Sequence, residues 1–234
     1  MTHLCSTPQT GLVEFPFLSG ADEELRRGVL LASRLRRFRR NEVLFHAGDP
    51  ANAMHLLMSG HVSVATTTPM GDTAILAVLG PGATFGEMAL LSDRHERSAT
   101  VTALDPVETR ALVRDEFARL RRTYPQVDRF LVDLLSGYVR RLDSRLLEAL
   151  YLPVEKRVLR RLVELADIYG GREPGTLVPL TQEVVAEMSG TTRPTANQIL
   201  RSAEAAGLIG IERGRLRIKD PAGLARRAGL PVRP

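Results

Sequence analysis

Residues 180–201, LTQEVVAEMSGTTRPTANQILR, carry the signals of two short helices joined by a tight turn. Thr181 is a good N-cap for the first helix, and Thr192 is a good N-cap for the second. Pro194 fits the first turn of the second helix, where its missing N–H has no helical partner. Gly190 permits the sharp turn between the helices. The positions predicted to face inward are Val184, Val185, Met188, Ala196, Ile199, Leu200 and Ala203. The segment is therefore predicted to be a helix-turn-helix.

The second helix keeps a polar outer face, as a helix that reads the major groove must. Arg193 can donate two hydrogen bonds to guanine, and Gln198 can pair with adenine. A hairpin follows, from Leu208–Glu212 and Arg215–Ile218 joined by Arg213-Gly214, and it predicts a wing that contacts phosphates. The alternative to a DNA-binding motif is an ordinary helical hairpin whose arginines are simply solvated. The predicted DNA-binding residues are Thr181, Thr192, Arg193, Pro194, Thr195, Asn197, Gln198, Arg201, Arg213 and Arg215, with Arg217 also on the wing.

The charge distribution favours a polyanionic partner for this end of the chain. Residues 153–234 contain 14 Lys and Arg against 9 Asp and Glu, whereas residues 1–152 contain 18 of each. The whole formal excess of positive charge therefore lies in the last third. A merely soluble basic domain is the alternative that charge alone leaves open.

Upstream, from about Arg39 to Leu112, the sequence predicts many short strands separated by turns that contain Gly and Pro. This pattern is typical of a β-barrel or sandwich. The expected strands are Glu42–Phe45, His55–Met58, His61–Thr66, Thr73–Val78, Thr100–Ala103 and Val107–Leu112. A short amphipathic helix, Ala21–Leu35, is predicted to precede them, with Leu25 and Val29 on its apolar side.

A long helix is predicted from Gln126 to Tyr151, after helical sequence that begins near Asp115. Its seam consists of Leu131, Leu135, Tyr138, Leu142, Arg145 and Ala149. Pairing of two such helices in a homodimer is favoured over packing on the chain's own barrel. Leu152-Pro153 ends the helix, and another helix, Val154–Tyr169, follows. The predicted division is a sensor domain 1–114, a dimerisation helix and hinge 115–152, and a DNA-binding domain 153–234.

Several classes of function are excluded by composition. The single cysteine, Cys5, can form no intrachain disulfide and cannot by itself hold a zinc ion or an iron–sulfur cluster. No apolar run approaches the length of a membrane helix, and the N-terminus lacks a secretory signal pattern. We therefore expect a cytoplasmic protein with no membrane partner and no metal. Catalytic triad, metal and nucleoside triphosphate motifs are absent, so an enzyme is not expected.

Residues 81–101, PGATFGEMALLSDRHERSATV, suggest a ligand site. Gly86 allows close approach of the backbone, and Glu87–Leu91 can form a short helix. Arg97 and Ser98 supply a guanidinium and a hydroxyl, which together suit a phosphodiester. Glu87 can accept hydrogen bonds from sugar hydroxyls. A buried Glu–Arg pair inside the barrel is the structural alternative.

The run Phe85–Leu91, followed by Arg97-Ser98-Ala99, resembles the phosphate-binding cassette of cyclic nucleotide-binding domains. With the helix-turn-helix, the chain resembles the cyclic AMP receptor branch of the CRP/FNR superfamily over about residues 15–220. The resemblance implies an α+β protein with a jelly-roll barrel (double-stranded β-helix), a dimerising helix and a winged helix. It also implies that cyclic AMP is the effector and that the protein is an activator with RNA polymerase as a partner. In such a site Gly86 and Glu87, beside Met88, would contact the ribose, and Arg97 and Ser98 would contact the cyclic phosphate.

The sequence departs from that family at the residues expected to contact the base of the nucleotide and at residues expected to read the DNA operator. Where cyclic AMP receptors use a Thr-Ser pair against adenine, this chain has either Leu142 and Asp143 or Arg145 and Leu146, depending on the alignment. Pro194 and Gln198 replace family residues of the recognition helix. The oxygen-sensing branch is excluded because the chain has a single cysteine, which cannot hold an iron–sulfur cluster. The residues interpreted as loop or barrel-surface positions rather than haem ligands are His46, His55, His61 and His95. The competing hypothesis is a ligand-independent family member in which Glu87 and Arg97 pair in an empty pocket.

Overall fold

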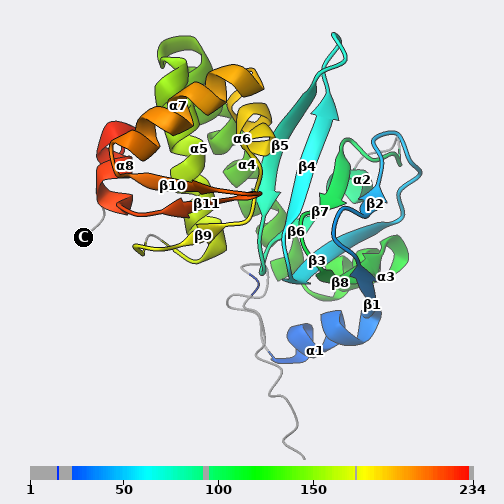
Figure 1. The fold of residues 1–234 in the computed structure, drawn as a ribbon. Coiled ribbons are helices and arrows are strands. Elements are labelled where there is room, and N and C mark those ends of the chain that lie inside the picture. Colours follow the sequence, from blue (N-terminus) through cyan, green and yellow to red (C-terminus); the bar gives the residue numbers. More distant parts are fainter. Residues whose placement is uncertain (1–14, 16–22, 92–94, 172, 232–234) are drawn as a thin grey trace, which may run out of the picture.

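The computed structural model describes Phe15 and residues 23–91, 95–171 and 173–231. An N-terminal barrel, a long helix and a C-terminal helical domain with a small sheet follow one another along the chain (Figure 1). This order confirms the predicted fold class. Ala21, where the first helix was predicted to begin, and Cys5 lie outside the described residues.

The barrel consists of two four-stranded sheets that face each other, with antiparallel pairing throughout. In the first sheet the order is β1-β8-β3-β6, and in the second it is β2-β7-β4-β5. Their bounds are β1 (Ser33–Phe38), β2 (Val43–Phe45), β3 (Ala53–Ser59), β4 (Val62–Thr67), β5 (Thr73–Leu79), β6 (Thr84–Phe85), β7 (Thr100–Ala103) and β8 (Val107–Val113). Apolar side chains from both sheets, among them Leu57, Phe85 and Val101, form a shared core.

Two strands of the barrel were missed by the sequence analysis, as was the short strand Leu177–Val178 near the C-terminal hairpin. The first helix, α1 (Glu23–Ala32), ends earlier than predicted, because Ser33–Phe38 pairs residue for residue with β8. That pairing satisfies backbone groups of β8 which a longer helix would leave open. Strand β6 has only two residues, too few to show an alternating pattern. The apolar side of α1 is as predicted, since Leu25 and Val29 are buried.

His55 corrects another interpretation, because it lies in the barrel interior rather than on its surface. It is 7% exposed, its ring stacks on Phe85 with centroids 5.1 Å apart, and its Nδ1 lies 3.1 Å from Thr109 Oγ1. Burial, with Arg97 and Arg36 nearby, lowers the pKa of His55 from 6.5 to about 4. The imidazole is therefore neutral at pH 7.

The long helix presents different apolar stripes to two sides. A short helix, α3 (Arg114–Thr123), leads into α4 (Gln126–Tyr151). Leu131 is buried against the barrel of its own chain, and Tyr138 reaches the barrel at Glu87. The apolar residues left exposed are Val132, Val139, Leu142, Leu146, Leu147, Leu150 and Tyr151. Of the predicted seam, Leu131, Tyr138 and Arg145 make contacts within the chain, whereas Leu142 and Ala149 are exposed.

The C-terminal part packs directly on the barrel. Its elements are α5 (Val154–Tyr169), β9 (Leu177–Val178), α6 (Gln182–Ser189), α7 (Arg193–Ala205), β10 (Ile209–Glu212), β11 (Arg215–Ile218) and α8 (Pro221–Arg227). Ile75 and Val78 of β5 belong to the same buried cluster as the α5 and α6 side chains, and α6 lies beside β5 (Figure 1). His61 also stacks on Tyr169 at a centroid distance of 3.9 Å.

Among the residues that the structure describes, no helix has both the length and the apolar character needed to cross a membrane. The same residues include no group of three or more His, Cys, Asp or Glu side chains arranged to hold a metal ion.

Candidate functional site

The predicted cassette begins at Gly86, a position where any other residue would be strained. Gly86 follows β6 with φ +80°, and Glu87 then leads into the one-turn helix α2 (Met88–Leu91). Arg97 Nη1 donates to the Gly86 carbonyl at 3.1 Å, and a Cβ at position 86 would stand 2.5 Å from that nitrogen. Gly86 therefore provides both the left-handed backbone conformation and the space for the guanidinium.

Arg97 is held in place by its backbone and by an aromatic ring. Its carbonyl accepts from Gly48 N at 2.8 Å, and its N–H donates to Asp49 O at 2.9 Å. The guanidinium lies 3.9 Å above the Phe45 ring, the side chain is 7% exposed, and Nε has no partner. Burial lowers the pKa of Arg97, although a guanidinium remains charged at neutral pH.

Glu87 is the second buried ionisable group of the cassette. It is 2% exposed, and its Oε2 has no hydrogen-bond partner. Burial raises the pKa of Glu87, while a hydrogen bond from the Tyr138 hydroxyl opposes that rise. Although both residues are described, the structure shows no ion pair between Glu87 and Arg97. The pairing that motivated a ligand-independent protein is not formed here.

A cavity of about 710 Å³ opens beside these two groups and extends from the barrel past α4 to α5. Its volume falls within the range of small-molecule sites. Of the predicted ligand residues, it brings together Gly86, Glu87, Met88, Arg97, Ser98, Leu142 and Arg145. Asp143 is not among the lining residues. Met88 is 44% exposed and Leu146 is 58% exposed.

Sequence reasoning missed several residues of this cavity. Tyr138 was assigned to the apolar helix seam, yet its hydroxyl bonds to Glu87. Arg141 places its guanidinium 4.8 Å from the Tyr138 ring centroid, at the wall of the cavity. Arg145, which was predicted both as a seam residue and as a ligand residue, pairs with Glu164 of α5 at 2.9 Å. The spacing of 138, 141 and 145 was available as a signal, because it puts all three on one face of a helix.

The helix-turn-helix forms as its caps indicate. Thr181 Oγ1 accepts from Val184 N, and Thr192 Oγ1 accepts from Thr195 N. Gly190 ends α6 in the left-handed conformation, with φ +59°. Pro194 stands in the first turn of α7.

The outer surface of α7 is mostly polar and accessible. The exposed positions are Thr192, Arg193, Pro194, Gln198 and Arg201, while Thr195 and Asn197 are half-buried. Arg201 pairs with Glu204 at 3.0 Å, and Asn197 Oδ1 is buried without a partner. Arg193 has no ion pair among the described residues and is exposed at the start of the helix.

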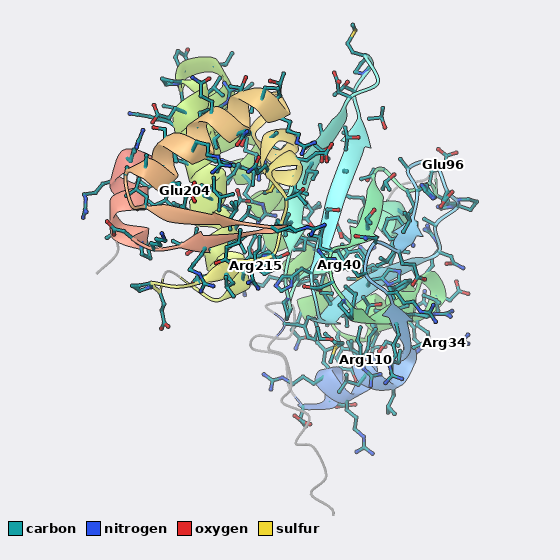
Figure 2. All side chains as sticks on the ribbon, in the orientation of Figure 1. Arg34, Arg40, Glu96, Arg110, Glu204 and Arg215 are labelled. Carbon is teal, nitrogen blue, oxygen red and sulfur yellow. The ribbon has the colours of Figure 1, made fainter. Side chains whose placement is uncertain are left out.

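The wing is a two-stranded hairpin whose arginines are not equivalent. Arg215 and Arg217 both bond to the carboxylate of Glu212, Arg217 at 2.9 Å, and these bonds lower the pKa of Glu212. Figure 2 labels Arg215 at the hairpin and Glu204 on α7. Arg213, in the turn, is exposed and makes no ion pair within the described part of the chain.

Comparisons with known proteins match two parts of the chain. The cyclic nucleotide-binding domain family matches residues 35–124, and the Crp-like helix-turn-helix domain family matches residues 156–227. A CRP-like cAMP-activated global transcriptional regulator of Mycobacterium tuberculosis is 30% identical over 194 residues, covering 82% of this chain and 86% of that protein.

Two further matches come from Thermus thermophilus. Its cyclic AMP receptor protein is 32% identical over 179 residues, covering 76% of this chain and 81% of the relative. The crystal structure of the catabolite activator protein of that species superposes with a TM-score of 0.54 at 30% identity, covering 92% of this chain and 100% of that one. This chain therefore belongs to the CRP/FNR superfamily of transcription regulators, with a cyclic nucleotide-binding domain followed by a Crp-like helix-turn-helix domain.

Proposed function

We propose that this regulator is a homodimer that binds cyclic AMP in its barrel and, in response, binds a palindromic DNA site. The observation that carries the effector is the pair of buried, unpartnered atoms at the cavity, Glu87 Oε2 and Arg97 Nε. Leaving such atoms unsatisfied costs about 1–3 kcal/mol each. A ligand with hydroxyl donors and an anionic acceptor removes both costs.

A cyclic nucleotide has both kinds of group in the required relation. Its ribose hydroxyl would donate to Glu87 beside Gly86 and Met88, and its phosphodiester would accept from Arg97 and Ser98. The base would then lie toward α4, at Leu142 with Asp143, or at Arg145 with Leu146. Cyclic AMP is the effector we favour because the relatives from Mycobacterium and Thermus are named for it.

The dimer is proposed from the exposed stripe of α4. Val132, Val139, Leu142, Leu146 and Leu150 recur at steps of three, four and seven, and each is more than half exposed in the single chain. A contiguous apolar stripe of this length is unusual on the surface of a monomer. Two copies packed along it would bury ten large side chains.

For DNA, we propose that α7 enters the major groove with Arg193 as the guanine reader, assisted by Gln198, Asn197 and Arg201. Thr181, Thr192 and Thr195 would contact phosphates, Pro194 would shape the first turn, and Arg213 with Arg215 would anchor the wing. The domains proposed for these tasks are residues 1–114 for sensing, 115–152 for dimerisation and 153–234 for DNA. The protein would act in the cytoplasm as an activator that contacts RNA polymerase, without catalysis of its own.

Titration calorimetry with cyclic AMP and cyclic GMP tests the effector, together with the melting temperature, which a ligand of the folded state must raise. We expect saturable binding of cyclic AMP and an increase in melting temperature. Absence of binding and of stabilisation at millimolar concentrations of both nucleotides would reject the effector. The protein would then be a ligand-independent regulator.

A further inference from the structure

The far wall of the cavity consists of charged side chains that the proposed nucleotide contacts leave largely unused. These are Arg145 and Glu148 of α4 and Arg160, Arg161 and Glu164 of α5. Tyr138, Arg141, Arg145 and Glu148 follow each other at steps of three and four, so they share one face of α4. This face begins at Glu87 of the cassette and ends at the DNA-binding domain.

The five charged residues form a continuous chain of ion pairs, which we call the junction cluster. Arg160 Nη1 lies 3.0 Å from Glu148 Oε1, and Arg161 Nη2 bonds to the other oxygen of that carboxylate. Arg161 Nη1 then lies 3.0 Å from Glu164 Oε2, and Arg145 Nη2 lies 2.9 Å from Glu164 Oε1. Glu148 and Arg161 are both buried, so salt and water screen their interaction weakly.

The junction cluster also reaches the far end of the DNA-binding domain. Arg160 Nε donates to the carbonyl of Ala228 at 3.1 Å, and its Nη2 donates to the carbonyl of Gly229 at 3.1 Å. Both carbonyls lie just after α8. One arginine therefore connects α4, α5 and the end of α8.

The backbone at the same place does not fix the angle between α4 and α5. Leu152 and Pro153 are both extended, with ψ of 136° and 149°. Two extended residues between helices allow the second helix to swing, unless side chains hold it. The junction cluster supplies those side chains, because its ion pairs cross from one helix to the other.

We propose that the junction cluster positions the DNA-binding domain and transmits occupancy of the cavity to it within a single chain. Its pairs hold the arrangement described above, in which α6 of the helix-turn-helix packs against β5 of the barrel. Within the cluster three guanidiniums face two carboxylates, a formal charge of +1, and Arg141 and Asp167 line the same cavity. A polar or anionic effector placed against the cluster competes for the arginines and loosens the α4–α5 contact. Only the identity of the effector in this inference rests on the proposed function.

Glu148→Gln is the direct test, because it keeps the shape of the side chain and removes the charge that two arginines share. Arg145→Gln is a milder second variant, since Arg145 has one ion-pair partner and is partly exposed. Glu155→Gln is the matched control. Its pair with Arg227 also joins two elements of the DNA-binding domain, α5 and α8, but it is more exposed and does not line the cavity.

The measurement is fluorescence anisotropy with a palindromic DNA selected in vitro with the unmodified protein, without effector and at saturating cyclic AMP. We expect Glu148→Gln to raise the effector-free DNA affinity about tenfold and to reduce the gain from cyclic AMP by a similar factor, within the range of allosteric couplings. Arg145→Gln should act in the same direction, and Glu155→Gln should change neither quantity.

A merely structural role would give a different result. The cluster variants would then melt at a lower temperature, while the effector-free affinity and the gain from cyclic AMP stayed within twofold of the unmodified protein. That outcome would overturn the inference. If the unmodified protein did not respond to cyclic AMP, the proposed effector would be wrong, but the effector-free DNA affinity of Glu148→Gln would still decide the role of the cluster.

Discussion

Arg97→Met is expected to abolish effector binding while leaving the effector-free protein about as stable as before. The substitution removes the one hydrogen bond that the guanidinium donates to the Gly86 carbonyl at 3.1 Å, worth about 1 kcal/mol. It also removes the contact with the Phe45 ring at 3.9 Å, worth about 1 kcal/mol, and the attraction of the guanidinium to the carboxylates of Asp49 and Glu87. Removing a buried cation returns a desolvation cost of several kcal/mol, of which the protein offsets only a part because Nε has no partner.

These opposing effects nearly cancel for folding but not for binding. We expect the melting temperature of the effector-free variant to stay within about 3 °C of the original, since about 1 kcal/mol corresponds to about 2–4 °C in a chain of this size. A cyclic phosphate, in contrast, loses a charge-assisted contact in a desolvated pocket. That loss should cost about 2–3 kcal/mol, which is more than tenfold in Kd.

Calorimetry with cyclic AMP and thermal unfolding without it would measure the two quantities on the same preparation. Arg37→Met is the matched control, because Arg37 is a barrel arginine whose pair with Glu108 is largely exposed. A fall in melting temperature of more than about 6 °C in Arg97→Met, with unchanged affinity for the nucleotide, would refute the reasoning. Arg97 would then be a structural ion rather than the phosphate ligand.

Three further predictions follow from other parts of the molecule. The pKa of His55 is lowered to about 4 in the folded chain, so between pH 6.5 and 4 only the unfolded chain binds a proton there. The free energy of unfolding should therefore fall over this range by about 3 kcal/mol more than it does in His55→Gln. Urea titrations at several pH values would measure the difference. Arg193→Ala should weaken DNA binding by about 1–3 kcal/mol per half-site and relax the preference at one base pair. Arg213→Ala should weaken binding to cognate and scrambled DNA alike and make the slope of log affinity against log salt concentration shallower by about one unit per half-site. Equal loss of affinity for both DNAs in Arg193→Ala would reverse these assignments. Leu142→Glu with Leu146→Glu should convert the dimer into a monomer in sedimentation at micromolar concentration, and an original protein that is already monomeric would exclude the α4 dimer.

Local chemistry explains why most of the elements could be predicted. The caps Thr181 and Thr192 and the turn at Gly190 depend on neighbours within a few residues, so the sequence contains nearly all the information that the helix-turn-helix needs. Strand β1 was missed for the opposite reason. Its arginine-rich sequence has no alternating apolar pattern, and only its pairing with a strand some 70 residues later makes it extended.

The same distinction applies to the candidate site. The cassette residues Gly86, Glu87 and Arg97 lie close in sequence and share a recognisable pattern. The residues contributed by α4 could not be assigned from the seam alone, because one helix faces both its own barrel and an open side. Tyr138 and Val139 are neighbours in sequence, yet Tyr138 lines the cavity and Val139 is exposed on the open side. Only the three-dimensional packing decides between these faces.

The positive charge of the DNA-binding domain shows why the location of charge matters more than its amount. Arg160 and Arg161 belong to the junction cluster, and Arg217 is held by Glu212. These arginines add to the formal excess but are paired with carboxylates, namely Glu148 of α4, Glu164 of α5 and Glu212 of the hairpin. Arg193 and Arg213 are exposed and have no ion pair among the described residues. Because the release of counterions from DNA depends on the cations that reach phosphates, these two positions should govern affinity far more than the excess of the last third suggests.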